Sequence, residues 1–497
     1  MPNSKEKLLE DCNVEIENFG PIFEGKISIK PLTIFIGSNN SGKSYASMLL
    51  HSIFGATDYA MRTFFQGWRG GYSPNLLVIL AFSKIDNKEI KEISKILNDS
   101  FQSKSKEVKI PKILIEKILT RIISFFYEDV LEKKLTYSFA SNLEDLIRKG
   151  ETSFKINFNN LCLQYKNKLE IINYPDMGLK YDLESPRLFN IKIFDEDHVI
   201  LKVKSLKLPG EDEELIEFIV SEIITEMLSQ LLNNLRHDSY YLPAARSGIV
   251  QAQRVLAANT FRLSFRAGIE DISIPSFSGV IADFLSSLQD LDREKGPFAR
   301  LANQFTNEII YGDIIVDYPN KESNNPEIKY EYDGMKIPLH RSSSTVSELA
   351  PLFLYLRYLA KPKGILIIEE PEAHLHPKNQ RILAKYLIRM MKMGLKIIIT
   401  THSDYLLDQL NNFILLSKLD KNEREKYGYK TNDYLNASDV SIYLFDYDSI
   451  SKGNKIQEIE INKEGITEES FTEVLDALYD ETNKIRRELS RLEAHDN

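Results

Sequence analysis

Three short apolar runs along the chain are each closed by polar or charged residues. They are residues 32–36, 364–368 and 395–399. Apolar runs of this length, without alternation of apolar and polar positions, are typical of strands buried on both faces of a parallel sheet. The residues after the first and third runs favour helices, so the pattern predicts strand–turn–helix units. The fold class that such units favour is α/β.

Between the first and second runs the pattern changes twice. Residues 85–150 are rich in Lys, Glu, Ile and Leu with helix-like clustering, which predicts a helical insertion, whereas residues 151–207 alternate as short strands do. A helix is expected near residues 212–235. This middle portion either contacts a partner or only covers the core. From Glu464 onward, apolar residues three or four apart predict an amphipathic helix, which docks on its own domain or on a neighbouring subunit.

These changes of pattern divide the chain into four segments: the first half of a core domain (1–75), an α+β insertion (76–236), the second half of the core domain (237–420) and a β/helical tail (421–497).

Composition places the 497-residue chain among ordinary folded proteins, with 43% hydrophobic and 27% charged residues. Two cysteines are too few for a disulfide framework or a zinc site. We find no leader and no apolar run of about 18 residues, so we expect a cytoplasmic protein without membrane insertion. The net charge of −9 disfavours nonspecific attraction to nucleic acid but is compatible with a local basic groove.

The turn after the first apolar run carries the sequence GSNNSGKS at residues 37–44. Gly37 and Gly42 give the backbone freedom and let main-chain N–H groups approach a ligand. The loop opens a helix, whose N-terminus attracts anions. Its spacing matches the phosphate-binding pattern G-x-x-x-x-G-K-[ST], in which Lys43 would neutralise the β- and γ-phosphates and the Ser44 hydroxyl would bind Mg²⁺.

Charged and polar residues also close the other two runs, where the carboxyl ends of parallel strands would meet the phosphate loop. We assign Glu369 to Mg²⁺ and Glu370 to polarising the attacking water. His402 follows the third run and could donate a hydrogen bond to the γ-phosphate or to that water. The pair His374 and His376 is not expected to bind zinc, because no third ligand is placed by the sequence.

The ordered segments GSNNSGKS, ILIIEEPEAHLHP and IIITTHSD resemble the ABC-type, AAA-annotated ATPases that include the OLD, RecF and SMC-like proteins. The resemblance implies a P-loop ABC-type ATPase head, with a mixed N-terminal β-region and a parallel sheet flanked by helices. It implies that residues 37–44 are the Walker A loop, Glu369 and Glu370 the Walker B pair, residues 374–377 the D-loop and His402 the switch histidine. The residues expected to bind the nucleotide are Gly37, Ser38, Asn39, Asn40, Ser41, Gly42, Lys43, Ser44, Ser343 and Ser344.

Ser343 and Ser344 belong to the candidate for a signature sequence, which in this family opens a helix facing the γ-phosphate held by a second subunit. Thr345 follows where relatives carry glycine. The resemblance therefore implies a head-to-tail dimer, or a larger homo-oligomer, that traps ATP between Walker A of one chain and the signature of the other.

The resemblance further implies an ATPase that uses ATP and Mg²⁺. After His402 we find too few residues for the TOPRIM nuclease domain of OLD-type proteins, so we do not expect the chain to cut DNA by itself. Two functions stay open. One is a nucleotide-gated sensor or scaffold for a separate nuclease or toxin, as in ATPase components of prokaryotic anti-phage or anti-plasmid defence. The alternative is a RecF/SMC-like DNA-binding clamp in repair.

A strand at residues 240–242 runs into a turn that carries Arg246. This turn either brings Arg246, Gln251 or Gln253 near the nucleotide, as the Q-loop of relatives does, or has a structural role. Further basic residues follow and form either a DNA-facing patch or a solvated helix face: Arg254, Arg262 and Arg266.

Overall fold

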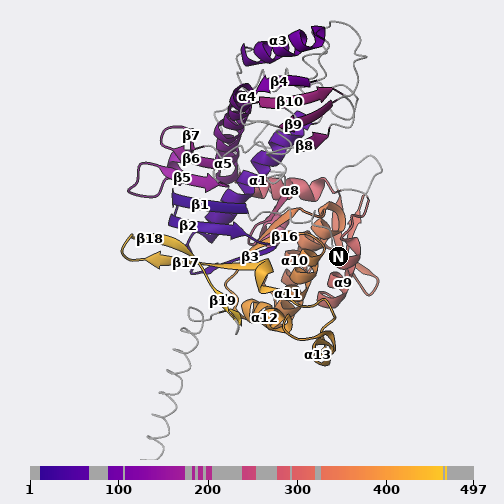
Figure 1. The fold of residues 1–497 in the computed structure, drawn as a ribbon. Helices are drawn as coiled ribbons and strands as arrows, with labels where there is room; N and C mark the ends of the chain where they lie inside the picture. The colour runs from indigo at the N-terminus through magenta and orange to yellow at the C-terminus, as the bar shows by residue number, and fades with distance from the viewer. Residues whose placement is uncertain are drawn as a thin grey trace, which may run out of the picture.

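The computed structural model describes residues 12–65, 88–103, 107–159, 161–173, 182–184, 189–193, 198–203, 238–252, 277–291, 294–318, 326–462 and 465–466 of the chain. Its main feature is an eleven-stranded sheet with helices packed on it (Figure 1). The predicted α/β class, with a parallel sheet and a mixed β-region, is confirmed.

The parallel half of this sheet contains the three predicted strands. In spatial order its strands are β11 (Ser239–Leu242), β15 (Ile365–Glu369), β16 (Lys396–Thr400), β3 (Leu32–Gly37) and β17 (Val440–Asp448). All neighbours in this group run parallel. Every residue of β15 and β16 is buried, which explains why apolar residues occupy consecutive positions in both strands. The carboxyl ends of these strands therefore lie along one edge of the sheet.

The other half of the sheet is mostly antiparallel. Its strands, in order, are β18 (Gly453–Glu458), β2 (Ile22–Ile29), β1 (Cys12–Phe19), β5 (Phe154–Phe158), β6 (Leu161–Tyr165) and β7 (Leu169–Asn173). Strand β18 is antiparallel to β17 and parallel to β2, and so joins the two halves. Strands from the predicted insertion (β5–β7) and from the predicted tail (β17 and β18) thus belong to the same sheet as the phosphate loop.

Two hydrophobic cores lie on the two faces of the parallel half. Along β15, Ile365 and Ile367 enter one core, whereas Leu366 and Ile368 enter the other. The helices that contribute to the first core include α1 (Lys43–Phe65), α3 (Lys88–Gln102), α4 (Lys112–Ser124) and α5 (Leu131–Phe139). Those of the second include α9 (Ala299–Ile309), α10 (Ser344–Leu354), α11 (Pro377–Lys392) and α12 (Asp404–Leu416). Helix α8 (Gly279–Gln289) contributes to both.

Shorter helical segments complete these layers. They are η2 (Phe125–Val130), η3 (Leu143–Leu146), η4 (Leu339–Arg341), η5 (Tyr355–Leu359), α13 (Lys421–Lys426) and η6 (Ala437–Asp439). Among the described helices, none is long and apolar enough to cross a membrane.

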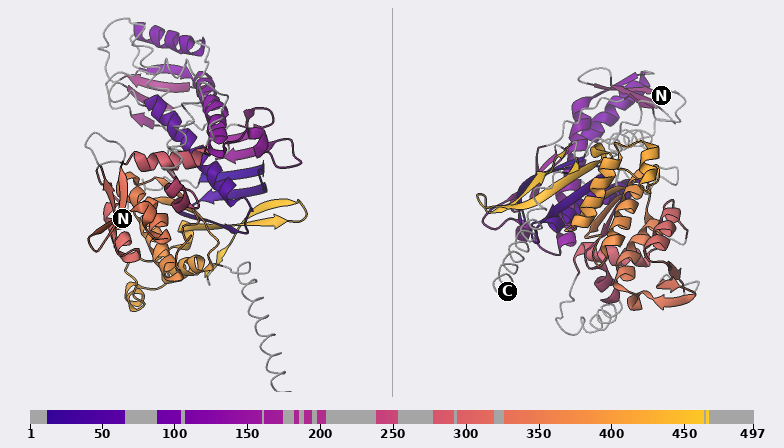
Figure 2. Two further views of the ribbon diagram at one scale, coloured as in Figure 1. Left: turned by 180° about the vertical axis from the view of Figure 1, so that it is seen from behind. Right: turned by 90° about the horizontal axis from the view of Figure 1, so that it is seen from below.

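Part of the insertion forms a separate layer away from the parallel half, at the top of Figure 1 and in both views of Figure 2. It is a four-stranded sheet in the order β4 (Glu107–Pro111), β10 (His198–Val203), β9 (Phe189–Ile193) and β8 (Asp182–Glu184). The prediction of a helical segment at residues 85–150 is wrong at β4. Val108 and Ile110 alternate with polar neighbours and are buried, and β4 pairs with β10 far along the chain.

A three-stranded antiparallel sheet precedes α10, with β12 (Asp313–Asp317), β13 (Glu327–Tyr332) and β14 (Met335–Pro338). Strands β19 (Ile461–Asn462) and β20 (Gly465–Ile466) form a small pair near the end of the described chain. The amphipathic helix predicted from Glu464 onward is wrong at Gly465–Ile466, which form β20, and the rest of it lies outside the described residues. So do the helix predicted near residues 212–235 and the roles of Gln253, Arg254, Arg262 and Arg266.

Candidate active site

The glycine-rich loop connects the end of β3 to the start of α1. Gly37 and Gly42 adopt φ values of 135° and 104°, which residues with a Cβ atom rarely adopt. A Cβ at Gly37 would lie 2.2 Å from the carbonyl oxygen of Phe445 on β17, and one at Gly42 would lie 2.8 Å from Ile22 Cγ1. Glycine is therefore required at both positions by backbone conformation and by close packing.

Lys43 is folded against this loop. Its Nζ donates hydrogen bonds to the carbonyl oxygens of Gly37 (2.9 Å) and Ser38 (2.7 Å) and to Ser41 Oγ (3.3 Å). Burial lowers the pKa of Lys43 to about 8, although the nearby charges of Glu370 and Glu369 act in the opposite direction. The cation is thus held at the loop and faces the two acids that close β15.

The remaining loop residues present polar groups to solvent. Ser38, Asn39 and Asn40 are exposed, and so is Ser44 in the first turn of α1. Asn40 adopts a φ of 61°, which reverses the chain at the tip. The loop therefore surrounds the N-terminus of α1, where unpaired main-chain N–H groups favour an anion.

Glu369 ends β15 and is mostly buried. Its Oε2 accepts a hydrogen bond from the Ala244 amide (3.1 Å), whereas its Oε1 is buried and accepts none from the described residues. A buried carboxylate oxygen with no partner fits a cation, and the exposed Ser44 hydroxyl supplies a second oxygen from the phosphate loop. These two oxygen ligands suit Mg²⁺, which is usually held by one or two protein groups plus phosphate and water.

Glu370 follows in a strained conformation with a φ of 42°. Its amide donates to the carbonyl oxygen (2.9 Å) and to Oγ1 (3.2 Å) of Thr400 at the end of β16. A left-handed non-glycine residue costs about 1–3 kcal/mol and is found mainly at functional sites. The side chain is 44% exposed, so the carboxylate can reach solvent and a ligand.

His402 faces the same space from the end of β16. Its Nε2 lies 3.9 Å from Glu370 Oε1, beyond hydrogen-bond distance. Burial lowers the pKa of His402, and the charge of Lys43 lowers it further, against the opposing effect of Glu370. The neutral imidazole that results at pH 7 has one N–H to donate. The structure therefore brings Lys43, Glu369, Glu370 and His402 together at one sheet edge.

Glu372 is a site residue that sequence reasoning missed. It is buried, and its Oε1 accepts hydrogen bonds from Thr401 Oγ1 (2.6 Å) and from the His402 amide (3.0 Å). Burial raises the pKa of this carboxyl group. Glu372 thus fixes the turn that presents His402. The only signal in the sequence is a third acid two positions after Glu370, and local pattern does not show that it turns inward.

The serines of the candidate signature lie at the start of α10. Ser343 is its N-cap and accepts a hydrogen bond from the Val346 amide (3.4 Å); Ser344 is the first helical residue, and both are exposed. Thr345 fits within the first turn, where its Oγ1 donates to the carbonyl oxygen of His374 (3.1 Å). The described hydrogen bonds of this segment do not include the chain's own loop at residues 37–44.

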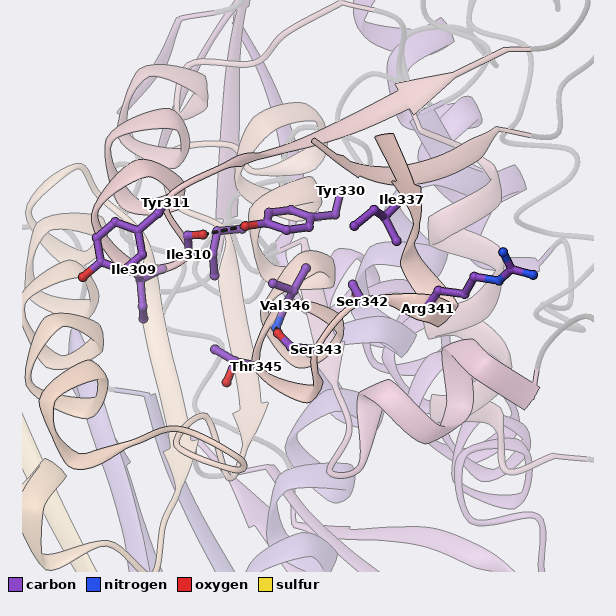
Figure 3. Close-up of a pocket in the computed structure, with 10 residues that line it drawn as sticks. All are labelled: Ile309, Ile310, Tyr311, Tyr330, Ile337, Arg341, Ser342, Ser343, Thr345 and Val346. Carbon is purple, nitrogen blue, oxygen red and sulfur yellow. Dashed lines mark hydrogen bonds between the residues drawn. The ribbon is translucent and has the colours of Figure 1, made fainter. Parts of the chain in front are cut away.

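A pocket of about 320 Å³ lies beside this helix start (Figure 3). It is lined by Ile309, Ile310, Tyr311, Tyr330, Ile337, Arg341, Ser342, Ser343, Thr345 and Val346. The Tyr330 hydroxyl donates to the Ile310 carbonyl oxygen (2.7 Å) across its upper wall. The surface next to Ser343 is therefore concave and partly aromatic.

Arg246 does not reach the phosphate loop. Arg246 is 1% exposed, and its guanidinium donates hydrogen bonds to the main-chain carbonyl oxygens of Glu369 and Glu370. Gln251, also proposed for a Q-loop role, is exposed. Arg246 is therefore a buried interior cation beneath the site.

Comparisons with known proteins place this site in context. A family model described as "AAA ATPase domain" matches residues 12–407. No curated protein sequence matches the chain. Similar solved structures include an SmcHead bound to the C-winged helix domain of ScpA (12% identity, TM-score 0.39, covering 91% of this chain and 98% of that one).

Two other solved structures are similar to the chain. One is an Smc head domain with an extended coiled coil bound to the C-terminal domain of ScpA, from Pyrococcus furiosus (12% identity, TM-score 0.35, covering 94% of this chain and 98% of that one). The other is an SMC head domain from Thermotoga maritima (10% identity, TM-score 0.31, covering 90% of this chain and 98% of that one).

Proposed function

Because this chain belongs to the AAA ATPase domain family, we propose that it binds and hydrolyses ATP at the edge of the parallel sheet. The observation that carries this proposal is the meeting of four groups there: the cation of Lys43, the carboxylates of Glu369 and Glu370, and the neutral imidazole of His402. A cation on a glycine-rich loop binds phosphate, and a free carboxylate beside it can accept a proton from water.

In this mechanism each residue has a separate task. Lys43 moves from the loop carbonyls to the β- and γ-phosphates. Ser44 and Glu369 would hold Mg²⁺, which supplies positive charge to the phosphates when it is bound. Glu370 orients the attacking water and accepts its proton, and His402 donates its N–H to the γ-phosphate as charge develops there.

We further propose that two copies share each ATP. Ser343 and Ser344 are exposed at the start of α10, where the first turn of a helix has main-chain N–H groups without intrahelical partners. The concave surface beside it could seat the neighbouring chain. Nucleotide would then act as a clamp, because a ligand that contacts both chains stabilises their association.

The clamp would serve as a nucleotide-gated sensor or scaffold for a separate nuclease or toxin in prokaryotic defence against phages or plasmids. Support for this role is the resemblance of the motif set to ATPase components of such systems. Co-expression of the chain with its neighbouring gene product tests it: we expect growth arrest that depends on Lys43. If purified duplex DNA alone stimulates hydrolysis and no effector is encoded nearby, the DNA-clamp alternative replaces this role.

The affinity for ATP is expected to fall as the pH rises above about 8. Burial lowers the pKa of Lys43 to about 8 in the free protein, and a bound triphosphate anion raises it again. Affinity is therefore full below the lower pKa and declines by up to about tenfold per pH unit above it, because binding then takes up one proton. Titration of a fluorescent ATP analogue at several pH values measures this slope.

The matched control for this titration is Lys43→Arg, whose guanidinium keeps its charge throughout the range. Its affinity should change little with pH, even if it is weaker at every pH. Equal slopes in the two proteins would show that a group other than Lys43 causes the dependence.

A further inference from the structure

Arg246 is among the largest fully buried side chains of the described protein, and it lies between two functional elements. It follows the turn after β11, in which Ala245 adopts a φ of 54°. A guanidinium without access to water is costly unless its donors are satisfied. The hydrogen-bond and ion-pair partners of Arg246 therefore indicate its role in the fold.

On one side Arg246 holds the main chain of the two acids that close β15. Its Nη1 donates to the carbonyl oxygen of Glu369 (2.6 Å) and to that of Pro243 (3.0 Å), and its Nη2 donates to the carbonyl oxygen of Glu370 (3.3 Å). Glu370 is the residue with the strained φ of 42°. Hydrogen bonds to the carbonyls on both sides of that strained centre stabilise it.

On the other side Arg246 is bound to helix α10. Its Nη2 lies 2.9 Å from Glu348 Oε1 in an ion pair, and its Nε donates to the Glu348 carbonyl oxygen (3.3 Å). The second carboxylate oxygen of Glu348, Oε2, accepts from the Ser247 amide (3.0 Å), and Glu348 is fully buried. Glu348 lies one turn after Ser344, so the ion pair is directly below the helix start.

We propose that Arg246 is a positioning residue that sets the conformation of Glu370 and couples it to helix α10. This inference rests on the proposed ATPase function. The guanidinium joins the strand end that bears the catalytic carboxylate to the helix whose start faces the nucleotide of a second copy. A displacement of the strand end on nucleotide binding is transmitted to that helix, because separating a buried ion pair leaves each charge without its partner and away from water.

The experiment compares Arg246→Lys with the wild-type chain in three measurements: kcat for ATP, the dissociation constant for an ATP analogue, and Tm. Lysine keeps the charge but cannot span the carbonyls of Glu369 and Glu370 together with Glu348. We expect kcat to fall at least about tenfold, since a small misplacement of a catalytic group costs up to about 10²-fold. The dissociation constant should stay within about threefold, because Lys43 and its loop are untouched.

The matched control is Arg389→Lys. Arg389, on α11, is also mostly buried, and its Nε and Nη2 each donate a 2.8 Å hydrogen bond to the carboxylate of Asp433. Its replacement should lower Tm without lowering kcat. If Arg246→Lys, like the control, lowers Tm without lowering kcat, the role of Arg246 is only structural and the inference is overturned. The same holds if kcat and ATP affinity fall by equal factors.

Glu348→Gln keeps the inference testable if Arg246→Lys does not fold, since glutamine retains the shape and an acceptor oxygen. It should reproduce the loss of kcat with unchanged affinity, and an unchanged kcat in Glu348→Gln alone would overturn the inference. When Arg246→Lys does fold, the double variant should lose little more than either single variant, because the two residues act as a unit. Additive losses would contradict coupling. A wild-type chain that binds no ATP would instead refute the proposed function, whereas fast hydrolysis by both wild type and Arg246→Lys refutes only this inference.

Discussion

Glu370→Gln is expected to lower kcat for ATP by about 10²- to 10⁴-fold, because an amide cannot accept the proton of the attacking water. ATP binding should persist, since in the proposed mechanism Lys43 and the glycine-rich loop make the phosphate contacts. The side chain is 44% exposed, so loss of its charge should leave folding intact. Steady-state phosphate release and analogue binding, measured on the same sample, separate the two effects.

The same substitution should make the shared-nucleotide assembly persist. With hydrolysis blocked, the ATP that joins two copies is not removed, and light scattering should report the mass of at least two chains in ATP and Mg²⁺ and of one chain without them. Glu425→Gln, at an exposed acid on α13, is the control for the loss of one negative charge. Turnover by Glu370→Gln at the wild-type rate would assign the general base to another group.

Lys43→Ala is expected to weaken ATP binding by at least about a hundredfold. Lysine at this position would make more than one charge-assisted hydrogen bond to phosphate, each contributing about 1.5–3 kcal/mol. The stability of the fold should not fall, because burial disfavours the charged form of Lys43 and so lowers its pKa. Removing this buried cation therefore removes an unfavourable contribution to folding. Isothermal titration calorimetry with ATP, together with Tm, measures both quantities.

Lys91→Ala, at an exposed lysine on α3, removes the same charge far from the phosphate loop and should leave the affinity unchanged. If Lys43→Ala bound ATP as tightly as this control, the loop at residues 37–44 would not be the phosphate site. Hydrolysis should then also be examined in Lys43→Arg, which retains the charge but not the compact ammonium group.

The sequence predicts the parallel part of the sheet well because its strands are buried on both faces. Unbroken apolar runs arise only where both faces are covered, and the residues that close each run must then meet at one edge. The placement of Lys43, Glu370 and His402 at one edge follows from this topology. Their proximity could therefore be predicted without knowledge of side-chain contacts.

Other features could not be predicted because they depend on pairings between distant segments. Arg246 has the charge of a surface residue, and only the folded chain shows Glu348 and two carbonyl oxygens around it. In the sequence, Glu372 is one of three acids close together, and nothing distinguishes it from the other two. Only the folded chain shows that it accepts hydrogen bonds from Thr401 and His402. Strand β4 is only five residues long within a stretch whose composition favours helices, and its pairing with the distant β10 defines it as a strand.

The position of β3 between β16 and β17 has a consequence during protein synthesis. Strand β3 is made before its neighbours Lys396–Thr400 and Val440–Asp448, which leave the ribosome only after the whole insertion has been synthesised. Until then both edges of an apolar strand stay unpaired, a state that invites aggregation. We expect the nascent chain to depend on chaperones, and the loop at residues 37–44 to take shape only after β16 and β17 have been synthesised.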